Sequence, residues 1–197
     1  MDLALFDFDG TITTREMLPA FVYSAVPPRR LRIGKLRLAP WIVGYKLGWV
    51  SGISIREKIA YAGFRGMRET EYLAAGERFA REALPPVLRR EAMARIAWHK
   101  QRGDTVVVVS GGFDVYLSHW CRTHGLELIC SKLEVADGVL TGRYGGAQCV
   151  RDEKPRRVRE RYGLGDFDAV YAYGDTPEDF ALLEISDHRR YRGEPMT

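Results

Sequence analysis

Short apolar runs along the chain each end abruptly at polar residues. The clearest runs span residues 3–6, 105–109 and 169–173, and they consist mainly of aliphatic and aromatic side chains. Runs of this length bounded by polar or glycine-containing turns are typical of buried strands. The pattern therefore predicts three core strands, spread over most of the chain.

Stretches with helical periodicity lie between these runs. They predict helices at about residues 86–101, 114–124, 155–162 and 177–184. Strands that alternate with helices favour a parallel sheet covered on both faces, so the expected class is α/β with a Rossmann-like sheet. Asp137-Gly138 lies between two short alternating runs and predicts a hairpin turn.

Residues 14–84 depart from this alternation. They contain no clear buried strand, are largely helical in pattern, and have Pro-Pro pairs at residues 27–28 and 85–86. We interpret them as a helical cap inserted after the first strand. Residues 1–13 and 85–197 would then form the Rossmann-like core.

The composition suits one domain with a small insert. The chain has 197 residues, 46% hydrophobic residues and a formal charge of +4, which is too mild to indicate nucleic acid binding by itself. Its three cysteines show no metal-site spacing, and its first residues do not resemble a signal peptide. We therefore expect reduced thiols and a cytoplasmic location.

Polar residues follow all three expected strands, at the sheet edge where parallel sheets bind ligands. Asp7 and Asp9 follow the first strand, and Asp175 follows the third, with Asp179 four residues later at an expected helix start. Two neighbouring carboxylates can act as nucleophile and general acid. Four converging carboxylates would repel one another without a hard cation such as Mg²⁺.

Two further features fit an anion at this edge. Ser110-Gly111-Gly112 follows the valine run, and glycines let backbone N–H groups approach an anion closely. Lys154 stands at an expected helix start, where a cation is unfavourable for the helix dipole. We therefore predict that Gly111 and Gly112 help to bind substrate and that Lys154 serves the site.

With these residues assembled, the chain resembles the haloacid dehalogenase superfamily of phosphatases. Its first motif is similar to residues 7–11, its second to Ser110, its third to Lys154 and its fourth to residues 174–179. The order and spacing match over nearly the whole core. Residues 109–114 and 137–142 look like the phosphoserine-phosphatase-like branch, which carries a helical cap between the first two motifs.

The resemblance implies a role for each of these residues. Asp7 would attack phosphorus and become an aspartyl phosphate, while Asp9 would protonate the leaving alcohol and then activate water. Ser110 and Lys154 would bind the phosphoryl oxygens. Mg²⁺ would be held by a set of four aspartates, with Asp9 contributing its backbone carbonyl and Asp179 supporting: Asp7, Asp9, Asp175 and Asp179.

Phosphoserine phosphatases also use two cap residues to bind substrate. Glu16 stands nine residues after Asp7, where their cap glutamate stands. The alignment places no arginine in register with their carboxylate-binding arginine, although Arg56 is nearby. We expect a small phosphorylated substrate similar to phosphoserine, and we predict that Glu16 contacts it.

The cap has an unusual charge distribution. From Arg29 to Arg68 there are ten Lys or Arg residues and one acidic residue, Glu57, and Trp41, Tyr45 and Trp49 recur at helical spacing. A basic amphipathic helix with tryptophans can contact an anionic membrane surface, or it can pack its apolar face on the core and leave its charges in solvent. Contact with nucleic acid is not expected, since the basic residues are patchy and no nucleic-acid motif accompanies them.

The sequence leaves other functions open. A phosphatase of a phospholipid head group, acting at the membrane surface, is one alternative. An aspartate-based phosphotransferase is another, and acceptor alcohols added to an assay would reveal it. A catalytically idle module that binds membranes or nucleic acid is a third, but the intact set of motif residues speaks against it.

Overall fold

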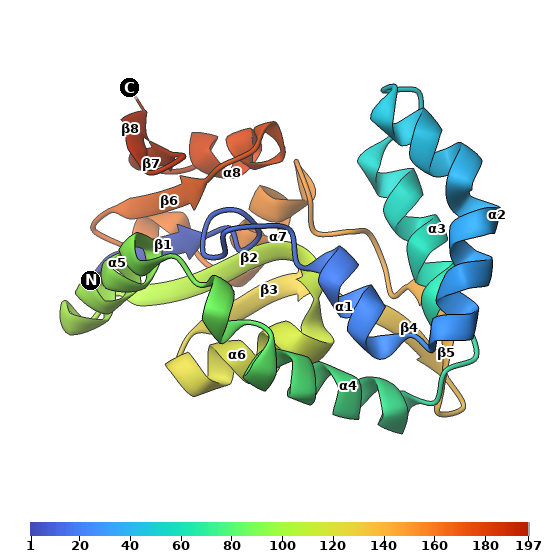
Figure 1. Cartoon of the computed structure of the whole chain (residues 1–197). Helices are drawn as coiled ribbons and strands as arrows, with labels where there is room; N and C mark the ends of the chain where they lie inside the picture. The colour runs from blue at the N-terminus through green and yellow to red at the C-terminus, as the bar shows by residue number, and fades with distance from the viewer. Residues whose placement is uncertain (197) are drawn as a thin grey trace.

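A six-stranded sheet forms the centre of the computed structural model, which describes residues 1–196 (Figure 1). Its strands are β1 (Leu3–Phe6), β2 (Thr105–Phe113), β3 (Glu127–Ser131), β6 (Val170–Gly174), β7 (His188–Tyr191) and β8 (Glu194–Met196). They are ordered β3-β2-β1-β6-β7-β8, and every neighbouring pair is parallel except β7 with β8. The strand β1 therefore lies inside the sheet, hydrogen-bonded on both edges.

Helices cover both faces of this sheet. Four follow β1 directly along the chain: α1 (Leu18–Ala25), α2 (Pro28–Lys46), α3 (Gly52–Phe64) and α4 (Glu69–Glu82). The others are α5 (Arg90–Gln101), α6 (Asp114–His124), α7 (Glu153–Arg161) and α8 (Phe180–Glu184). Short 3₁₀ turns are η1 (Pro85–Val87), η2 (Leu164–Asp166) and η3 (Pro177–Asp179), and a separate hairpin is formed by β4 (Leu133–Ala136) and β5 (Val139–Tyr144).

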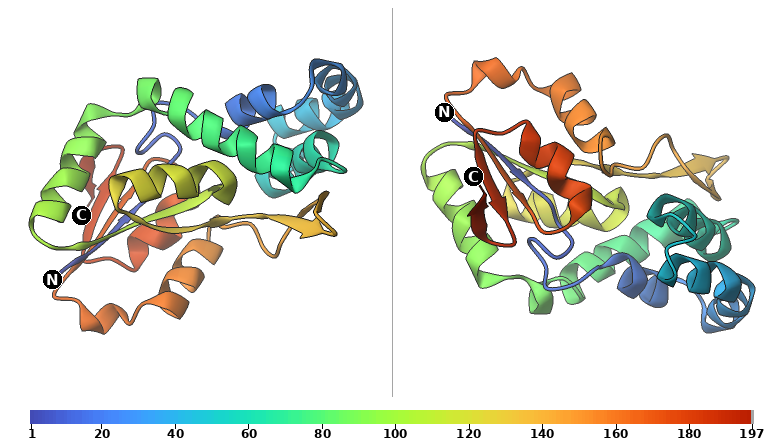
Figure 2. Two further views of the ribbon diagram at one scale, coloured as in Figure 1. Left: turned by 90° about the horizontal axis from the view of Figure 1, so that it is seen from below. Right: turned by 90° about the horizontal axis from the view of Figure 1, so that it is seen from above.

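The alternation of side chains along β1 explains the two layers of helices. Leu3 and Leu5 lie in a cluster with residues of α7 and α8, whereas Ala4 and Phe6 lie in a cluster with residues of α5 and α6. Successive side chains of a strand point to opposite faces, so a fully apolar strand must be covered twice. Figure 2 shows α7 on one side of the sheet and α5 and α6 on the other. The predicted α/β class is confirmed.

Several elements differ from the sequence prediction. The strand β2 continues past the valines to Phe113, with a register shift against β3 between Ser110 and Phe113, so the expected loop at residues 110–112 is an irregular strand end. The expected helix at 86–101 is divided into η1 and α5. The strands β3 and β7 were not predicted, because their half-buried and partly charged residues lack a clear apolar run.

The helices α1 to α4 lie between β1 and α5 in the chain, and α2 and α3 form an antiparallel pair that projects from the sheet (Figure 1). At Gly76 of α4, a Cβ would lie 2.3 Å from the carbonyl oxygen of Val115, so glycine lets α4 pack closely on α6. We propose residues 14–84 as the cap and 1–13 with 85–197 as the core; residue 197 lies outside the described residues. No helix within residues 1–196 combines the length and apolar composition that a membrane span requires.

Candidate active site

Asp7 stands at the carboxyl end of the central strand. Its backbone N–H donates to the carbonyl oxygen of Tyr173 at 2.9 Å, which continues the pairing of β1 with β6. Ser110 near the end of β2 and Asp175 just after β6 flank it. The parallel sheet therefore brings together three of the expected polar clusters, as its topology requires.

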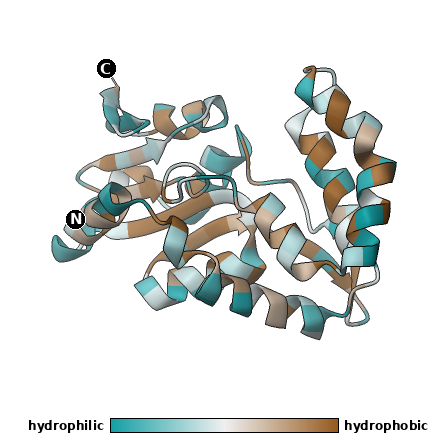
Figure 3. Cartoon of the chain, viewed as in Figure 1, coloured by the Kyte–Doolittle hydropathy of each residue, from teal (hydrophilic) through white to brown (hydrophobic). Residues whose placement is uncertain are grey.

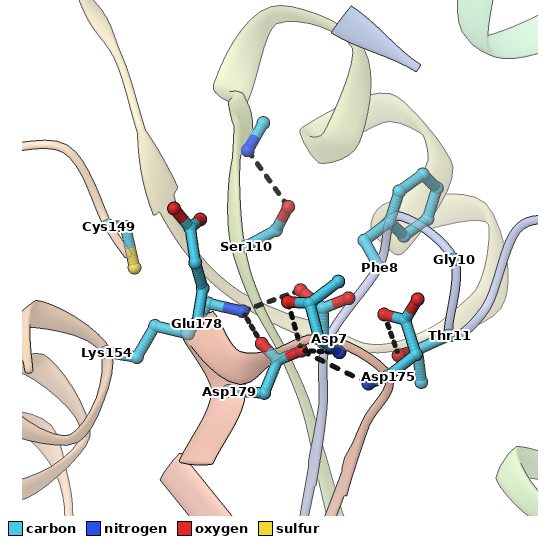
Figure 4. A network of polar contacts seen from close by, with 12 residues as sticks. Asp7, Phe8, Gly10, Thr11, Ser110, Cys149, Lys154, Asp175, Glu178 and Asp179 are labelled. Carbon is cyan, nitrogen blue, oxygen red and sulfur yellow. Dashed lines mark hydrogen bonds and ion pairs between the residues drawn. The ribbon is translucent and has the colours of Figure 1, made fainter. Parts of the chain in front are cut away.

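Lys154 connects two of these clusters through its ammonium group. Its Nζ donates to Oδ1 of Asp7 and to Oδ1 of Asp179, each at 2.6 Å, and all three side chains are buried (Figure 4). Burial opposes the charged ammonium, but the two carboxylates outweigh it and raise the pKa of Lys154 above its usual value. The lysine is therefore a fixed positive charge beside Asp7.

Asp179 reaches this cluster in a different way from the one its spacing suggested. Its Oδ2 accepts hydrogen bonds from the backbone N–H groups of Asp175 at 3.1 Å and Thr176 at 3.0 Å. This is a capping box at the start of η3 rather than the shared face of an α-helix. Burial works against the charge of Asp179, but Lys154 and these N–H groups lower its pKa below the usual value. The carboxylate is thus held ionised and in a fixed orientation.

The carboxylates of Asp7, Asp175 and Asp179 form a group suited to a metal ion. Each offers an oxygen, and these oxygens lie within 4.8 Å of one another. Burial, followed by the nearby aspartates, raises the pKa of Asp7 to about 7, and burial together with Asp179 raises the pKa of Asp175. Three carboxylates facing one ammonium leave an excess of negative charge, and oxygen donors of this kind fit a hard cation such as Mg²⁺.

Asp9 lies beside Asp7, is partly buried and is not part of this group of three. Its Oδ1 accepts a hydrogen bond from the N–H of Met17 at 3.0 Å, and both residues contribute to the junction between β1 and the cap. Burial, with the charges of Asp7 and Glu16, raises the pKa of Asp9 well above its usual value. A carboxyl group that holds its proton near neutral pH can act as a general acid.

The loop after Asp9 is fixed by residues that sequence reasoning passed over. Gly10 has φ +84°, and a Cβ there would lie 2.2 Å from Oδ2 of Asp175, so only glycine fits without a shift. Thr11 donates its hydroxyl to Oδ1 of Asp175 at 3.2 Å. Arg89 donates from Nε to the carbonyl oxygens of Gly10 and Thr13. Thr11 could have been predicted as a site residue from its position in the first motif, whereas the sequence around Arg89 gave no such indication.

Ser110, Gly111 and Gly112 line the same small cavity as Asp7 and Lys154. The N–H of Gly112 donates to Oγ of Ser110 at 2.9 Å, so this donor is occupied within the protein. The hydroxyl of Ser110 is buried at the sheet edge, where it can still donate its proton to an anion. The structure thus brings these residues to the site at the end of β2.

The cap contributes Glu16 and Arg56. Both line the cavity, although Glu16 is otherwise exposed, and burial raises the pKa of Glu16 while Arg56 opposes the rise. Arg56 donates from Nε to Gln148 Oε1 at 3.0 Å and from Nη2 to Glu178 Oε1 at 3.1 Å. Arg56 and Glu178 were not among the predicted site residues. The only signal for Arg56 was its place in the cap near the position expected for an arginine.

Comparisons with known proteins agree with this geometry. The family model for haloacid dehalogenase-like hydrolases matches residues 4–184. Protein CicA of Caulobacter vibrioides is 32% identical over 196 residues, which cover 96% of this chain and 85% of that protein. A phosphoserine phosphatase of Halobacterium salinarum is 30% identical over 194 residues, covering 94% of this chain and 83% of the relative.

Solved structures share the fold. A Bordetella pertussis protein described as having unknown function superposes with a TM-score of 0.79 at 26% identity, over 95% of this chain and 88% of that one. A substrate-bound phosphoserine phosphatase superposes with a TM-score of 0.68 at 22% identity, over 96% of this chain and 84% of that one. At this lower identity the second likeness concerns the fold alone.

Proposed function

Because this chain belongs to the haloacid dehalogenase-like hydrolases, we propose that it is a Mg²⁺-dependent phosphatase that works through an aspartyl phosphate at Asp7. Its family and its phosphoserine phosphatase relative make it a phosphoric monoester hydrolase. The observation that carries the mechanism is the buried ammonium of Lys154, shared between Asp7 and Asp179 at the end of the central strand. Phosphoryl transfer depends mainly on positioning and on neutralising charge, and this arrangement supplies both.

The first half of the proposed reaction forms the phosphoenzyme. Lys154 engages Oδ1 of Asp7, so we assign the attack on phosphorus to Oδ2. The bond from phosphorus to the alcohol oxygen breaks, and the protonated carboxyl of Asp9 gives its proton to that oxygen. Ser110 and Lys154 bind the phosphoryl oxygens, and Lys154 also favours the ionised, nucleophilic form of Asp7 against the effect of burial.

The second half releases phosphate. The carboxylate of Asp9, now ionised, takes a proton from a water molecule, whose oxygen attacks phosphorus. The bond between phosphorus and Asp7 then breaks, which restores both aspartates. Asp9 thus acts as acid in one half and as base in the other, as its raised pKa permits.

We propose that Mg²⁺ is held by Asp7, Asp175 and the backbone carbonyl of Asp9, with Asp179 supporting. When bound, this ion would supply positive charge to the phosphoryl oxygens. The protein's own contribution is to hold its carboxylates in place: Asp179 through η3 and Lys154, and Asp175 through the hydroxyl of Thr11.

Removal of the metal should abolish activity. We expect EDTA to inactivate the protein, Mg²⁺ to restore it and Ca²⁺ to support it poorly, because Mg²⁺ requires near-octahedral geometry and shorter bonds. Asp175→Ala should raise the Mg²⁺ concentration for half-maximal activity at least about tenfold, the lower end of the losses seen when a metal site is weakened. Asp152→Ala, at an exposed residue just before α7, is the matched control. Full activity after exhaustive chelation would contradict the metal proposal.

The first candidate substrate is a small phosphorylated metabolite similar to phosphoserine. The cavity at Asp7 measures about 50 Å³, which suits a phosphoryl group. Glu16 and Arg56 at its cap side could meet an ammonium and a carboxylate of the alcohol part. Arg56 would have to leave Glu178 in order to bind such a carboxylate.

A second candidate acts at a membrane surface, and the exposed face of α2 favours it. Ile33, Leu36 and Val43 of this helix, and Leu47 just after it, lie on one side, with Leu36 79% exposed, and Trp49 just beyond is 81% exposed. Figure 3 shows hydrophobic residues interspersed with hydrophilic ones along α2. Large apolar side chains gathered on one exposed face indicate a contact surface. Trp41 is also partly exposed, although Lys58 lies over its ring at 3.6 Å.

We expect weak, salt-sensitive association with anionic vesicles and very little with neutral ones. Arg29, Arg32, Lys35 and Arg37 are exposed on α2, and each basic residue near an anionic surface contributes ~1 kcal/mol. The exposed Trp49 should add to this, so Trp49→Ala should weaken binding. Co-sedimentation at low and high salt measures both effects.

The charge variant should be Arg29/Arg32/Arg37→Glu. Arg30 is left intact because its guanidinium donates to the carbonyl oxygens of Ala62 and Arg65 and connects α2 with α3. The matched control makes the same charge change on other elements, at the exposed Arg81, Arg122 and Arg159. If both triple variants lose vesicle binding equally, or if the wild-type protein does not bind at low salt, the membrane-surface role is wrong. The cap would then serve only to cover the substrate.

A further inference from the structure

The cap forms a second, half-open cavity beside the catalytic one. It measures about 400 Å³ and lies between α1, α2 and α3, within the size range of ligand sites of ~300–1,000 Å³. Its walls are mainly hydrocarbon. The apolar residues that contribute most are Leu18 and Val22 of α1, Leu31, Leu38 and Ile42 of α2, and Ile55 and Ile59 of α3.

The spacing of these residues shows that the cavity is built by facing helices. Leu31, Leu38 and Ile42 are separated by seven and four residues, which places them on one side of α2, opposite its exposed apolar face. Ile55 and Ile59 are four apart on α3 and face them. Leu38, Ile42 and Ile59 are only half-buried, so a ligand between them would remove further apolar surface from water.

The walls of this cavity are fixed to one another. Arg30 of α2 donates from Nε to the carbonyl oxygen of Ala62 at 2.8 Å and from Nη2 to that of Arg65 at 2.5 Å, at the end of α3. Near the other end of α2, the ammonium of Lys58 lies over the ring of Trp41. These two contacts, one at the end of α3 and one at its middle, hold α2 and α3 together around the space between them.

The two cavities share a boundary. Glu16, Leu18 and Arg56 line both the catalytic cavity and the cap cavity. The catalytic cavity, at about 50 Å³ against about 400 Å³, has room for the phosphoryl group but not for a large alcohol. When the phosphoryl group of a substrate lies at Asp7, its alcohol part therefore extends past Glu16 and Arg56 toward the cap cavity.

We infer that the alcohol part of the substrate carries a hydrocarbon chain that lies in the cap cavity between α1, α2 and α3. This inference rests on the proposed phosphatase function and names its substrate class, an amphiphilic phosphomonoester. The polar part next to the phosphate passes Glu16 and Arg56, and the chain contacts the leucines and isoleucines beyond. Phosphoserine has no such chain and would leave this cavity unfilled.

The test uses n-alkyl phosphates of two to twelve carbons, each kept below its critical micelle concentration. With Mg²⁺ and the wild-type protein, kcat/KM should rise about two- to fourfold per methylene until the cavity is filled, and then level off. The change should lie mainly in KM, because the chain contacts are the same in the ground state and the transition state. A kcat/KM that does not depend on chain length would overturn the inference.

Two neighbouring residues of α2 give matched variants. Ile42→Trp places a large ring inside the cavity and should reduce the gain per methylene to nearly onefold, whereas Val43→Trp on the exposed face should keep the wild-type dependence. Ile59→Trp repeats the obstruction from the α3 side in case the first variant folds poorly, which thermal unfolding would show. A steep chain-length dependence that persists in both obstructed variants would contradict this location for the chain.

Direct binding separates this inference from the proposed function. Titration calorimetry with the same alkyl phosphates and the Asp7→Asn variant reports affinity without turnover. If affinity rises with chain length but no phosphomonoester is hydrolysed by the wild-type protein, the phosphatase proposal fails and the chain site stands. If ethyl phosphate is hydrolysed and longer chains bind no better than ethyl phosphate, the phosphatase proposal stands and the chain site fails.

Discussion

Replacing Asp7 by asparagine should abolish turnover and leave the fold intact. The amide has the same shape as the carboxylate but cannot attack phosphorus, so we expect kcat to fall by about 10⁴-fold or more, the scale seen when a nucleophile is removed. The backbone hydrogen bond from Asp7 to Tyr173 does not depend on the side chain. Lys154 would still be paired with Asp179, so no buried charge is left alone.

The measurement combines steady-state kinetics, thermal unfolding and acid-quenched labelling with a ³²P substrate. Wild-type protein should retain label on Asp7 and the variant should not. Asp137→Asn is a suitable control, since Asp137 is exposed in the β4–β5 turn and Asn-Gly forms the same type of turn as Asp-Gly. Substantial activity in the folded Asp7→Asn protein would exclude the covalent mechanism.

Replacing Asp9 by asparagine should slow the reaction by roughly 10²–10⁴-fold, the usual contribution of general acid–base catalysis. The asparagine can still accept the hydrogen bond from the N–H of Met17, so the junction with the cap should keep its geometry. It cannot supply the proton that the raised pKa of Asp9 keeps available. The loss should therefore be chemical rather than structural.

Leaving-group dependence distinguishes an acid from a residue that only positions others. In single-turnover phosphorylation, the rate with an alkyl phosphate should fall by the full factor, because its alkoxide leaving group needs a proton. p-Nitrophenyl phosphate should suffer much less, because its phenolate leaves without one. Equal losses for the two substrates in this step would mean that Asp9 is not the acid.

Much of the fold could be predicted because it is encoded in local patterns. The run 105–109 lies within β2, and the helix expected at 114–124 is α6 with the same bounds. In both segments the local sequence indicates which residues are buried, through a continuous apolar run in β2 and through apolar residues at helical spacing in α6. The strand β7 could not be found in this way. Its residues His188–Tyr191 are only half-buried near the edge of the sheet, and they form a strand because β6 and β8 offer hydrogen-bond partners.

The candidate site shows the same division. The order of the polar clusters after the strands pointed to Asp7, Ser110 and Asp175, because parallel strands end at one edge. It did not show Arg56, which meets Glu178 across 122 residues of chain. Such a pair leaves no periodic trace in either segment, since neither residue's neighbours depend on the contact.

By itself the sequence determined the class of the sheet, the order of the four polar clusters and the kind of chemistry they can support. These follow from side-chain type and from spacing along one segment. Only the tertiary structure decided that Lys154 lies between Asp7 and Asp179, and that the apolar sides of α2 and α3 line a half-open cavity rather than packing directly on each other. An amphipathic pattern in the sequence indicates which face of a helix avoids water. Whether that face packs on another helix or borders a cavity depends on how the helices pack.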